Sequence, residues 1–194
     1  PRSDFGIGIV TALVRIEGRP FGLLANNPHH LGGAIHAPAA DKAARFLQLC
    51  DTPGFMVGPE VEKLAQVRHV SRMFVTSASL SVPYFTVVLR KGYGLGAQGM
   101  TGGSFHAPFF IVSWPTGEFG GMGLEGAVRL AYRRELEAVD DPAARDALYQ
   151  KLVAQLYQAG KAINMAAFLE IDDVIDPAES RRWIVSFCFG LVHG

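Results

Sequence analysis

The sequence predicts an α/β protein, and three observations support this. Its 194 residues are 49% hydrophobic, which is enough to bury a core in one domain or in two small ones. Short runs of apolar and β-branched residues alternate with longer stretches whose apolar residues recur at helical spacing, the order typical of α/β folds. Glycine is plentiful, with 22 residues, and no internal repeat or low-complexity linker is visible.

The first half of the chain begins with an expected β-hairpin. Residues 9–16 are short and β-branched, residues 17–20 supply turn residues, and residues 21–25 resume the apolar run. A loop rich in Asn, Gly, Pro and His follows at residues 26–38. Apolar residues at helical spacing then predict helices at residues 39–49 and 60–79.

The second half alternates in the same way. We expect buried strands and helical stretches separated by glycine or proline. In chain order these are a strand at 83–89, a glycine-rich turn at 92–103, a strand at 109–114, helical stretches at 126–136 and 142–168, an extended piece at 171–177 and a last helix that starts at 177.

Charge and hydropathy narrow the function classes. Eighteen basic residues balance 18 acidic ones, so there is no electrostatic footprint for nucleic acid or an anionic membrane. No apolar run reaches the ~18 residues of a membrane helix. The chain starts without an initiator Met or signal-peptide character, so we expect a fragment or a processed product. Cys50 and Cys188 show no metal-ligand or redox-pair spacing, which favours buried thiols in a reducing compartment.

The segment GLGAQG at residues 94–99 matches the pattern G-x-G-x-x-G of dinucleotide-binding turns. That fingerprint requires an acidic residue about 20 positions on, at the end of the next strand. Glu118 lies at about this distance, but it follows a loop beyond the next strand, so a dinucleotide site is not favoured. Small residues still let a ligand approach the backbone, and a helix that follows would direct its free N–H groups at an oxygen. The segment therefore predicts an anion or oxyanion site.

Two other groups of residues carry weaker signals. Glu118 and Glu125 form a candidate carboxylate pair for hydrating a double bond, although a helix start explains Glu125 equally well. His29 and His30 lie in a Gly/Asn/Pro loop, where a surface pair is favoured over a metal site. Neither group identifies a reaction.

Several segments together resemble the carboxyltransferase subunits of propionyl-CoA, acetyl-CoA and related biotin-dependent acyl-CoA carboxylases. The matching segments occur in the order found in that family and cover nearly the whole chain. They are GRPFGLLANNP (18–28), DKAARF (41–46), DTPGFMVG (51–58), PYFTVVLRKGYGLGAQGM (83–100), GLEGAV (123–128) and DPAESRR (176–182).

This resemblance implies a crotonase (ClpP-like) fold, a spiral of ββα units. It implies that residues 1–194 are the C-terminal, biotin-facing domain of a carboxyltransferase, with the N-terminal acyl-CoA-binding half absent. The implied partners are acyl-CoA, a carrier domain or protein that bears biotin, the N-terminal half and further copies in a homo-oligomer. In such oligomers the active site forms between the N-terminal half of one subunit and the C-terminal half of its partner. No metal, nucleic acid or membrane is implied, and the compartment is the bacterial cytoplasm or the mitochondrial matrix.

The resemblance also implies the chemistry. In the family, carboxybiotin releases carbon dioxide, the ureido nitrogen takes the α-proton of the thioester, and the enolate attacks the carbon dioxide. The protein contributes two oxyanion holes of backbone N–H groups, one for the thioester oxygen and one for the ureido oxygen.

The second of these holes falls on the turn at Tyr93 and Gly94. Many relatives have Gly-Gly-Ala after the Tyr, whereas here Leu95 replaces the second Gly. The expected catalytic donors are therefore the N–H groups of Leu95 and Gly96, with Ala97 in reserve, provided that Leu95 does not need a positive φ. Tyr93, Gly94, Leu95 and Gly96, together with Gly54 and Phe55, form the expected biotin-binding set.

One departure from the family lies between Cys50 and Thr52. There the family has a buried strand and its approach, about ten residues by typical strand and loop lengths. A missing central strand would leave ladder groups unpaired, each costing ~1–3 kcal/mol. We therefore expect residues to be omitted from the sequence at this point; a continuous, ordered chain would refute the omission.

Two alternative functions remain open from the sequence. One is a free-standing crotonase-like hydratase or thioesterase that uses Glu118 or Glu125. The other is a non-catalytic assembly domain of a carboxylase complex.

Overall fold

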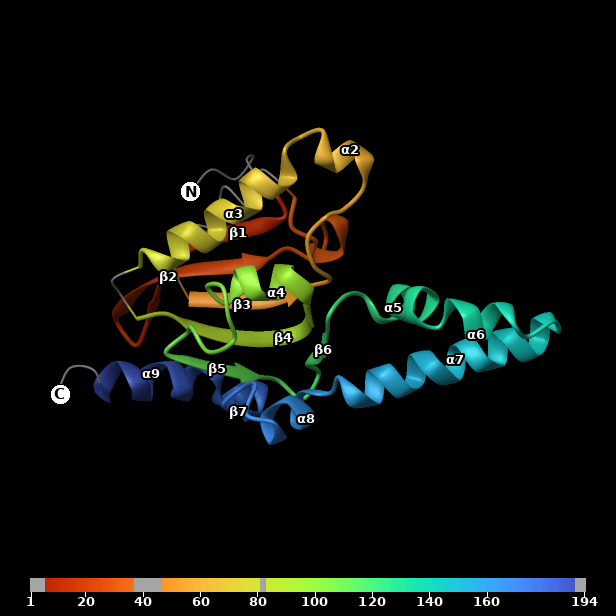
Figure 1. The fold of residues 1–194 in the computed structure, drawn as a ribbon. Helices are drawn as coiled ribbons and strands as arrows, with labels where there is room; N and C mark the ends of the chain where they lie inside the picture. The colour runs from red at the N-terminus through yellow and green to blue at the C-terminus, as the bar shows by residue number, and fades with distance from the viewer. Residues whose placement is uncertain (1–5, 37–46, 81–82, 191–194) are drawn as a thin grey trace.

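The computed structural model describes residues 6–36, 47–80 and 83–190, and its centre is a seven-stranded sheet (Figure 1). The strand order is β1-β2-β3-β4-β5-β7, and β6 pairs with the end of β4. The strands are β1 (Ile9–Ile16), β2 (Arg19–Asn26), β3 (Leu47–Thr52), β4 (Phe85–Tyr93), β5 (Phe110–Ser113), β6 (Glu118–Gly120) and β7 (Asp173–Val174). β1 and β2 form the predicted antiparallel hairpin, and the other pairings are parallel. The α/β prediction is confirmed.

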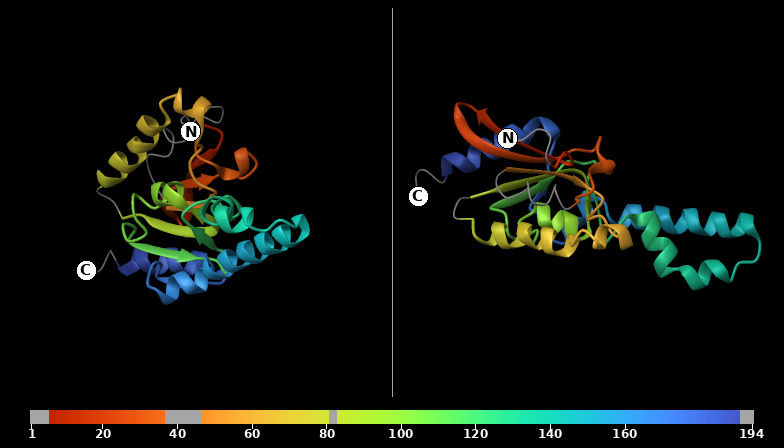
Figure 2. Two further views of the ribbon diagram at one scale, coloured as in Figure 1. Left: turned by 45° about the vertical axis from the view of Figure 1, so that its right-hand side comes forward. Right: turned by 90° about the horizontal axis from the view of Figure 1, so that it is seen from above.

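Helices lie on both faces of this sheet and in an arm beside it. They are η1 (Leu31–Gly33), α2 (Pro59–Glu62), α3 (Gln66–Ala78), α4 (Gly94–Met100), α5 (Leu124–Ala131), α6 (Arg133–Glu137), α7 (Pro142–Ala159), α8 (Ala162–Ala167), η2 (Pro177–Glu179) and α9 (Ser180–Gly190). α3 and α4 lie on one face and α9 on the other (Figures 1 and 2).

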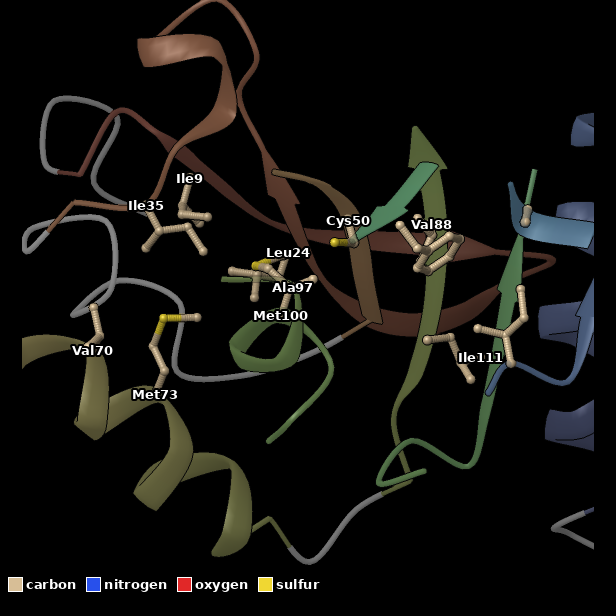
Figure 3. Packing of buried hydrophobic residues seen from close by; sticks show 13 residues of the cluster. Ile9, Leu24, Ile35, Cys50, Val70, Met73, Val88, Ala97, Met100 and Ile111 are labelled. Carbon is tan, nitrogen blue, oxygen red and sulfur yellow. The ribbon is translucent and has the colours of Figure 1, made fainter. Parts of the chain in front are cut away.

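The alternation of side chains along the central strands builds a separate core on each face. Along β5, Phe110 and Val112 pack with Ile184 of α9, whereas Ile111 packs on the side of α3 and α4. This is the period of two expected of a strand buried on both faces. Figure 3 shows the α3–α4 side, where Ala97 and Met100 of α4 meet Leu24 of the hairpin. α4 is thus packed against the hydrophobic core through Ala97 and Met100.

β3 corrects two expectations from the sequence. Residues 39–46 of the predicted helix 39–49 lie outside the described residues, and Leu47–Thr52 form a strand instead of the end of a helix. β3 pairs in parallel with both β2 and β4, so residues 47–52 form a central strand where we expected that strand to be missing; an omission of residues beside Cys50 stays a prediction. The physical reason is that a six-residue segment with buried Gln48 and Cys50 satisfies the ladder groups of both neighbours.

The predicted helix at 60–79 is also corrected, because it is two helices. α2 ends at Glu62, and α3 begins at Gln66 after Ala65, whose φ of 55° places it in the left-handed region. The left-handed conformation of Ala65 interrupts helical geometry and changes the direction of the chain between α2 and α3. This break sets the direction of α3 and buries Gln66 at its start.

The predicted helical stretch at 142–168 divides at Gly160. α7 starts at Pro142 with Asp141 as its N-cap, since the Asp141 side chain accepts from Ala144 N at 2.9 Å. A Cβ on Gly160 would lie 2.1 Å from Phe119 O, so only glycine allows α7 to end against β6. α5, α6 and α7 then project from the sheet as an arm (Figures 1 and 2).

Candidate functional site: a backbone turn between two cavities

The expected glycine-rich turn is the junction of β4 and α4. The strand continues to Tyr93, and α4 begins at Gly94 with a φ of 57°. The positive φ thus falls on a glycine, and Leu95 is not among the residues with positive φ in the described part of the chain. Leucine at this position therefore keeps its N–H group in helical geometry without backbone strain.

The first turn of α4 lies directly against the segment after β3. A Cβ on Gly96 would lie 2.6 Å from the Cα of Gly54 and 3.0 Å from the backbone N of Phe55. Real Cβ atoms do not approach backbone this closely, so Gly96 is required for the contact. The structure therefore brings together the two segments, 54–55 and 94–96, that the sequence assigned to one site.

Three backbone N–H groups at this contact have no acceptor in the described residues. The N–H groups of Leu95 and Gly96 are in the first helical turn, where an α-helix provides no partner. Phe55 is bridged to Ile35 on one side only: Ile35 N donates to Gly54 O at 3.1 Å, and Met56 N donates to Ile35 O at 3.0 Å. The N–H of Phe55 is directed away from that bridge, toward α4.

The N–H of Phe55 is a candidate donor that the sequence analysis did not name, because the sequence placed Phe55 only as a wall of the pocket. Ala97, the reserve donor, follows in the same helical turn, and no backbone acceptor for its N–H is found in the described residues either. The missed signal is the pair of glycines, Gly54 and Gly96, which allows two backbones to touch.

Two cavities flank the turn. The larger, of about 540 Å³, is lined by Gly94 and Gln98 of α4 together with Phe119, Gly121 and the base of the helical arm. The smaller, of about 340 Å³, lies between α4, α3 and residues 55–57, and Leu95 and Phe55 both line it. The turn is therefore accessible to a ligand from either side.

Tyr93, the last residue of β4, is fixed by a hydrogen bond. Its hydroxyl donates to Glu118 Oε2 of β6 at 2.9 Å. Burial of the ring, together with this bond, raises the pKa of Tyr93 far above its ordinary value. Tyr93 therefore stays neutral and positions the start of α4 rather than exchanging protons.

The two candidate carboxylates are each bound by a tyrosine. Glu118 accepts from Tyr93, and Glu125 Oε1 accepts from Tyr157 at 2.8 Å. The pKa of Glu125 is lowered, first by a hydrogen bond from its own backbone N–H and then by the Tyr157 hydroxyl. Glu125 is therefore ionised at neutral pH and is unsuited to act as a general acid.

The described segments offer neither a cluster of metal ligands nor a membrane-spanning helix. They contain no group of three or more His, Cys, Asp or Glu side chains placed to hold a metal ion. His29 is exposed, and the ring of its neighbour His30 lies 5.0 Å from that of His36. No helix in these segments is both long and apolar enough to span a bilayer.

The parallel sheet, the helices on its two faces and the glycine-lined helix start define a crotonase-like α/β fold. The family described as "Carboxyl transferase domain" matches residues 2–189 of this chain. The chain belongs to the carboxyl transferase domain family, and the resemblance seen in the sequence is confirmed.

Individual relatives support this membership. The methylmalonyl-CoA carboxyltransferase 12S subunit of Propionibacterium freudenreichii subsp. shermanii is 35% identical over 197 residues, which cover 95% of this chain and 37% of that subunit. A crystal structure of a transcarboxylase 12S hexamer with methylmalonyl-CoA bound has a TM-score of 0.83 at 36% identity, covering 93% of this chain and 36% of its own.

A single-chain, multi-domain long-chain acyl-CoA carboxylase has a TM-score of 0.84 at 58% identity. The match covers 95% of this chain but 19% of that one. The chain thus spans little more than a third of the length of the curated relatives that it matches.

Proposed function

We propose that this chain is the biotin-facing, C-terminal half of the carboxyltransferase of a biotin-dependent acyl-CoA carboxylase. One observation carries the proposal: the free N–H groups of Phe55, Leu95 and Gly96 gather where Gly96 touches Gly54. In this proposal residues 1–194 act as one domain, and the acyl-CoA-binding half is supplied by the part of the protein that corresponds to the rest of the longer relatives.

The three N–H groups would bind the ureido oxygen of biotin. Backbone donors fixed by β3 and α4 need no reorganisation when negative charge grows on that oxygen, so they stabilise the charged state more than the neutral one. Carboxybiotin, when bound, supplies the carboxyl group that is transferred to the α-carbon of an acyl-CoA. The residues present fit such a group, since the donors adjoin a cavity with apolar walls and no Cβ intrudes at Gly96.

The partners follow from the same proposal. The acyl-CoA, the carrier domain that bears biotin and the N-terminal half of the carboxyltransferase would all meet at the turn between the two cavities. The relative described as a hexamer with methylmalonyl-CoA bound supports a homo-oligomer as the working assembly.

The test is a carboxylation assay with the full-length protein that carries this sequence, its biotinylated carrier, labelled bicarbonate and a series of acyl-CoAs. Gly96→Val should abolish carboxyl transfer, because the side chain cannot fit against Gly54. Glu125→Gln should retain it, since no proton transfer by this carboxylate is required.

Two other results would support the alternatives. Biotin-independent turnover of an acyl-CoA or enoyl-CoA that is lost in Glu118→Gln or Glu125→Gln would favour a hydratase or thioesterase. Wild-type carboxylation by Gly96→Val, with normal assembly, would favour a non-catalytic domain.

A further inference from the structure

A buried side-chain amide joins two segments that lead to Phe55. Asn26, the last residue of β2, is 7% exposed. Its Oδ1 accepts from the backbone N of Asp51 at 3.0 Å, and its Nδ2 donates to the backbone oxygen of Gly33 at 3.4 Å. The amide nitrogen can only donate and the amide oxygen can only accept, so these two backbone groups also fix the orientation of the side chain.

The bond to Asp51 extends the contact between β2 and β3 beyond their ladder. β3 lies between β2 and β4 (Figure 1), and its pairing with β2 ends at Ala25 and Leu49. Two residues further on, the N–H of Asp51 donates to the Asn26 side chain, and the register of β3 with β4 shifts at the same residue. Asn26 therefore holds β3 where its regular pairing with both neighbours is interrupted.

The bond to Gly33 attaches the second segment to the same place. Gly33 has a φ of 88°, and a Cβ on it would lie 2.3 Å from the backbone oxygen of Asp51. The two backbones are therefore in direct contact beside the Asn26 amide. Two residues after Gly33, Ile35 forms the parallel bridge to Phe55. The segment that pairs with Phe55 is thus attached to the same side chain as β3.

Two short routes lead from Asn26 to Phe55. One runs along the chain from Asp51 over four residues, and the other runs from Gly33 over two residues to Ile35 and its bridge. Together they close a ring of covalent and hydrogen bonds in which no segment can move alone. The position of the Phe55 N–H, one of the proposed donors, therefore depends on a side chain that lies outside the β4–α4 turn.

We infer that Asn26 is a positioning residue for carboxyl transfer, because it sets where the Phe55 N–H stands relative to the N–H groups of Leu95 and Gly96. The inference rests on the proposed function and adds to the donor set a residue that holds it in place. Donors to a developing charge must be held within about 0.5 Å of their productive positions. Loss of the Asn26 amide should therefore slow the chemical step and leave acyl-CoA binding unchanged.

The test is a double-mutant cycle in the full-length protein that carries this sequence. The kcat of biotin-dependent carboxylation and the KM for acyl-CoA are measured for the wild type, Asn26→Leu, Gly96→Ala and the double variant. Leu is of similar size to Asn but has no polar group, so both bonds are lost. Asn26→Leu alone should lower kcat by about tenfold at unchanged KM, because a donor is misplaced but not removed.

The cycle separates positioning from a general loss of structure. Gly96→Ala already moves the start of α4 away from Phe55, so little remains for Asn26 to position. In that background Asn26→Leu should lower kcat by less than about twofold. An effect unrelated to the donors would give a further loss of about tenfold, since the effects of independent changes on the activation free energy add.

Thr86→Val is the matched control. Thr86 is fully buried, and its hydroxyl donates to Gln48 Oε1 at 3.2 Å between β3 and β4. The change therefore also removes a buried side-chain hydrogen bond of β3, but at the end of the strand opposite to Gly54. Its Tm should fall as that of Asn26→Leu does, while its kcat should stay at the level of the parent protein in both backgrounds.

Asn26→Asp is the second variant should Asn26→Leu fail to fold. It can still accept from Asp51 N, but its ionised carboxylate cannot donate to Gly33 O, so kcat should again fall at unchanged KM. Wild-type kcat in the Asn26 variants, or losses from the Asn26 and Gly96 changes that multiply in full, would overturn the inference while the proposed function stands. Absence of biotin-dependent carboxylation by the wild type would overturn both.

Discussion

Gly96 and Gly54 lie backbone against backbone, with room for no side-chain atom between them: a Cβ on Gly96 would be 2.6 Å from the Cα of Gly54. This contact brings the end of the β3 segment to the start of α4, although more than 40 residues separate them in the chain. The free N–H groups on both sides are close together only because of it.

Gly96→Ala should lower the carboxyl-transfer rate by about 100-fold, comparable to the loss of one oxyanion donor. The methyl group forces the turn of α4 away from Phe55 and separates the donors. Steady-state assays should show the loss mainly in kcat. Gly126→Ala is the matched control, because Gly126 is exposed in α5 and its Cβ would meet only the flexible end of Met122 at 3.4 Å. Equal activity of the two variants would contradict the proposed donor set.

Asp51→Ala should lower the free energy of unfolding by about 2 kcal/mol, which corresponds to about 4–8 °C in Tm for a chain of this size. Asp51 Oδ1 accepts from the backbone N of Lys91 at 3.0 Å, and the carboxylate also binds the Arg90 guanidinium. These bonds attach β3 to β4 where the register shifts between Cys50 and Thr52.

Asp51→Asn distinguishes the contribution of the hydrogen bond from Lys91 N from that of the ion pair with Arg90. The amide oxygen can still accept from Lys91 N, while the charge opposite the half-exposed Arg90 is lost. Exposed ion pairs contribute little, so Asn should recover most of the stability in thermal unfolding. A decrease in Tm as large as that of Asp51→Ala would show that the ion pair with Arg90, and not the hydrogen bond from Lys91 N, stabilises the pairing of β3 with β4.

Tyr93→Phe should lower Tm by about 2–4 °C, since it removes a hydrogen bond of about 1 kcal/mol between partly buried groups. It should also reduce kcat moderately, because Glu118 no longer fixes the residue before Gly94. Tyr132→Phe is the control, as no hydrogen bond of the Tyr132 hydroxyl is found in the described residues. A change of pH should restore neither the Tm nor the kcat of Tyr93→Phe, because Tyr93 acts as a neutral hydrogen-bond donor.

Cys50 should make the protein less stable at alkaline pH. Burial raises the pKa of the thiol from 9.0 to about 12, so between these values the folded state keeps a proton that the unfolded state has lost. The free energy of unfolding therefore falls as pH rises through this window, by up to about 1.4 kcal/mol per pH unit. Cys50→Ala should be less stable at pH 7 but should lose less between pH 9 and 10.5, as measured by urea unfolding. If the free energy of unfolding fell equally with pH in the two proteins, the loss of stability at alkaline pH could not be assigned to the Cys50 thiol.

The sequence predicted the elements whose patterns are local. The hairpin, the strand before the glycines and the start of α7 at Pro142 all follow from short-range signals of turn residues, β-branching and capping. The site segments 54–55 and 94–96 were also found, since their glycines mark close approach of a backbone.

Features that depend on distant residues were not predictable. β3 reads as a helix end in isolation, and only its place between β2 and β4 makes it a strand. The left-handed conformation of Ala65 could not be predicted from the local sequence, because glycine or asparagine is the usual residue in that conformation. The N–H of Phe55 becomes a free donor only through the bridge to Ile35, which no spacing in the sequence reveals.

The shortness of β3 has a mechanical consequence. β3 has six residues, and the chain continues directly into Gly54 and Phe55. The register of β3 in the sheet therefore also sets the position of the Phe55 amide. A slip of one residue would displace that amide by about 3.3 Å, more than the whole length of the hydrogen bond it is meant to make. If the proposed function holds, the rate of carboxyl transfer should therefore depend on the register of β3 in the central sheet.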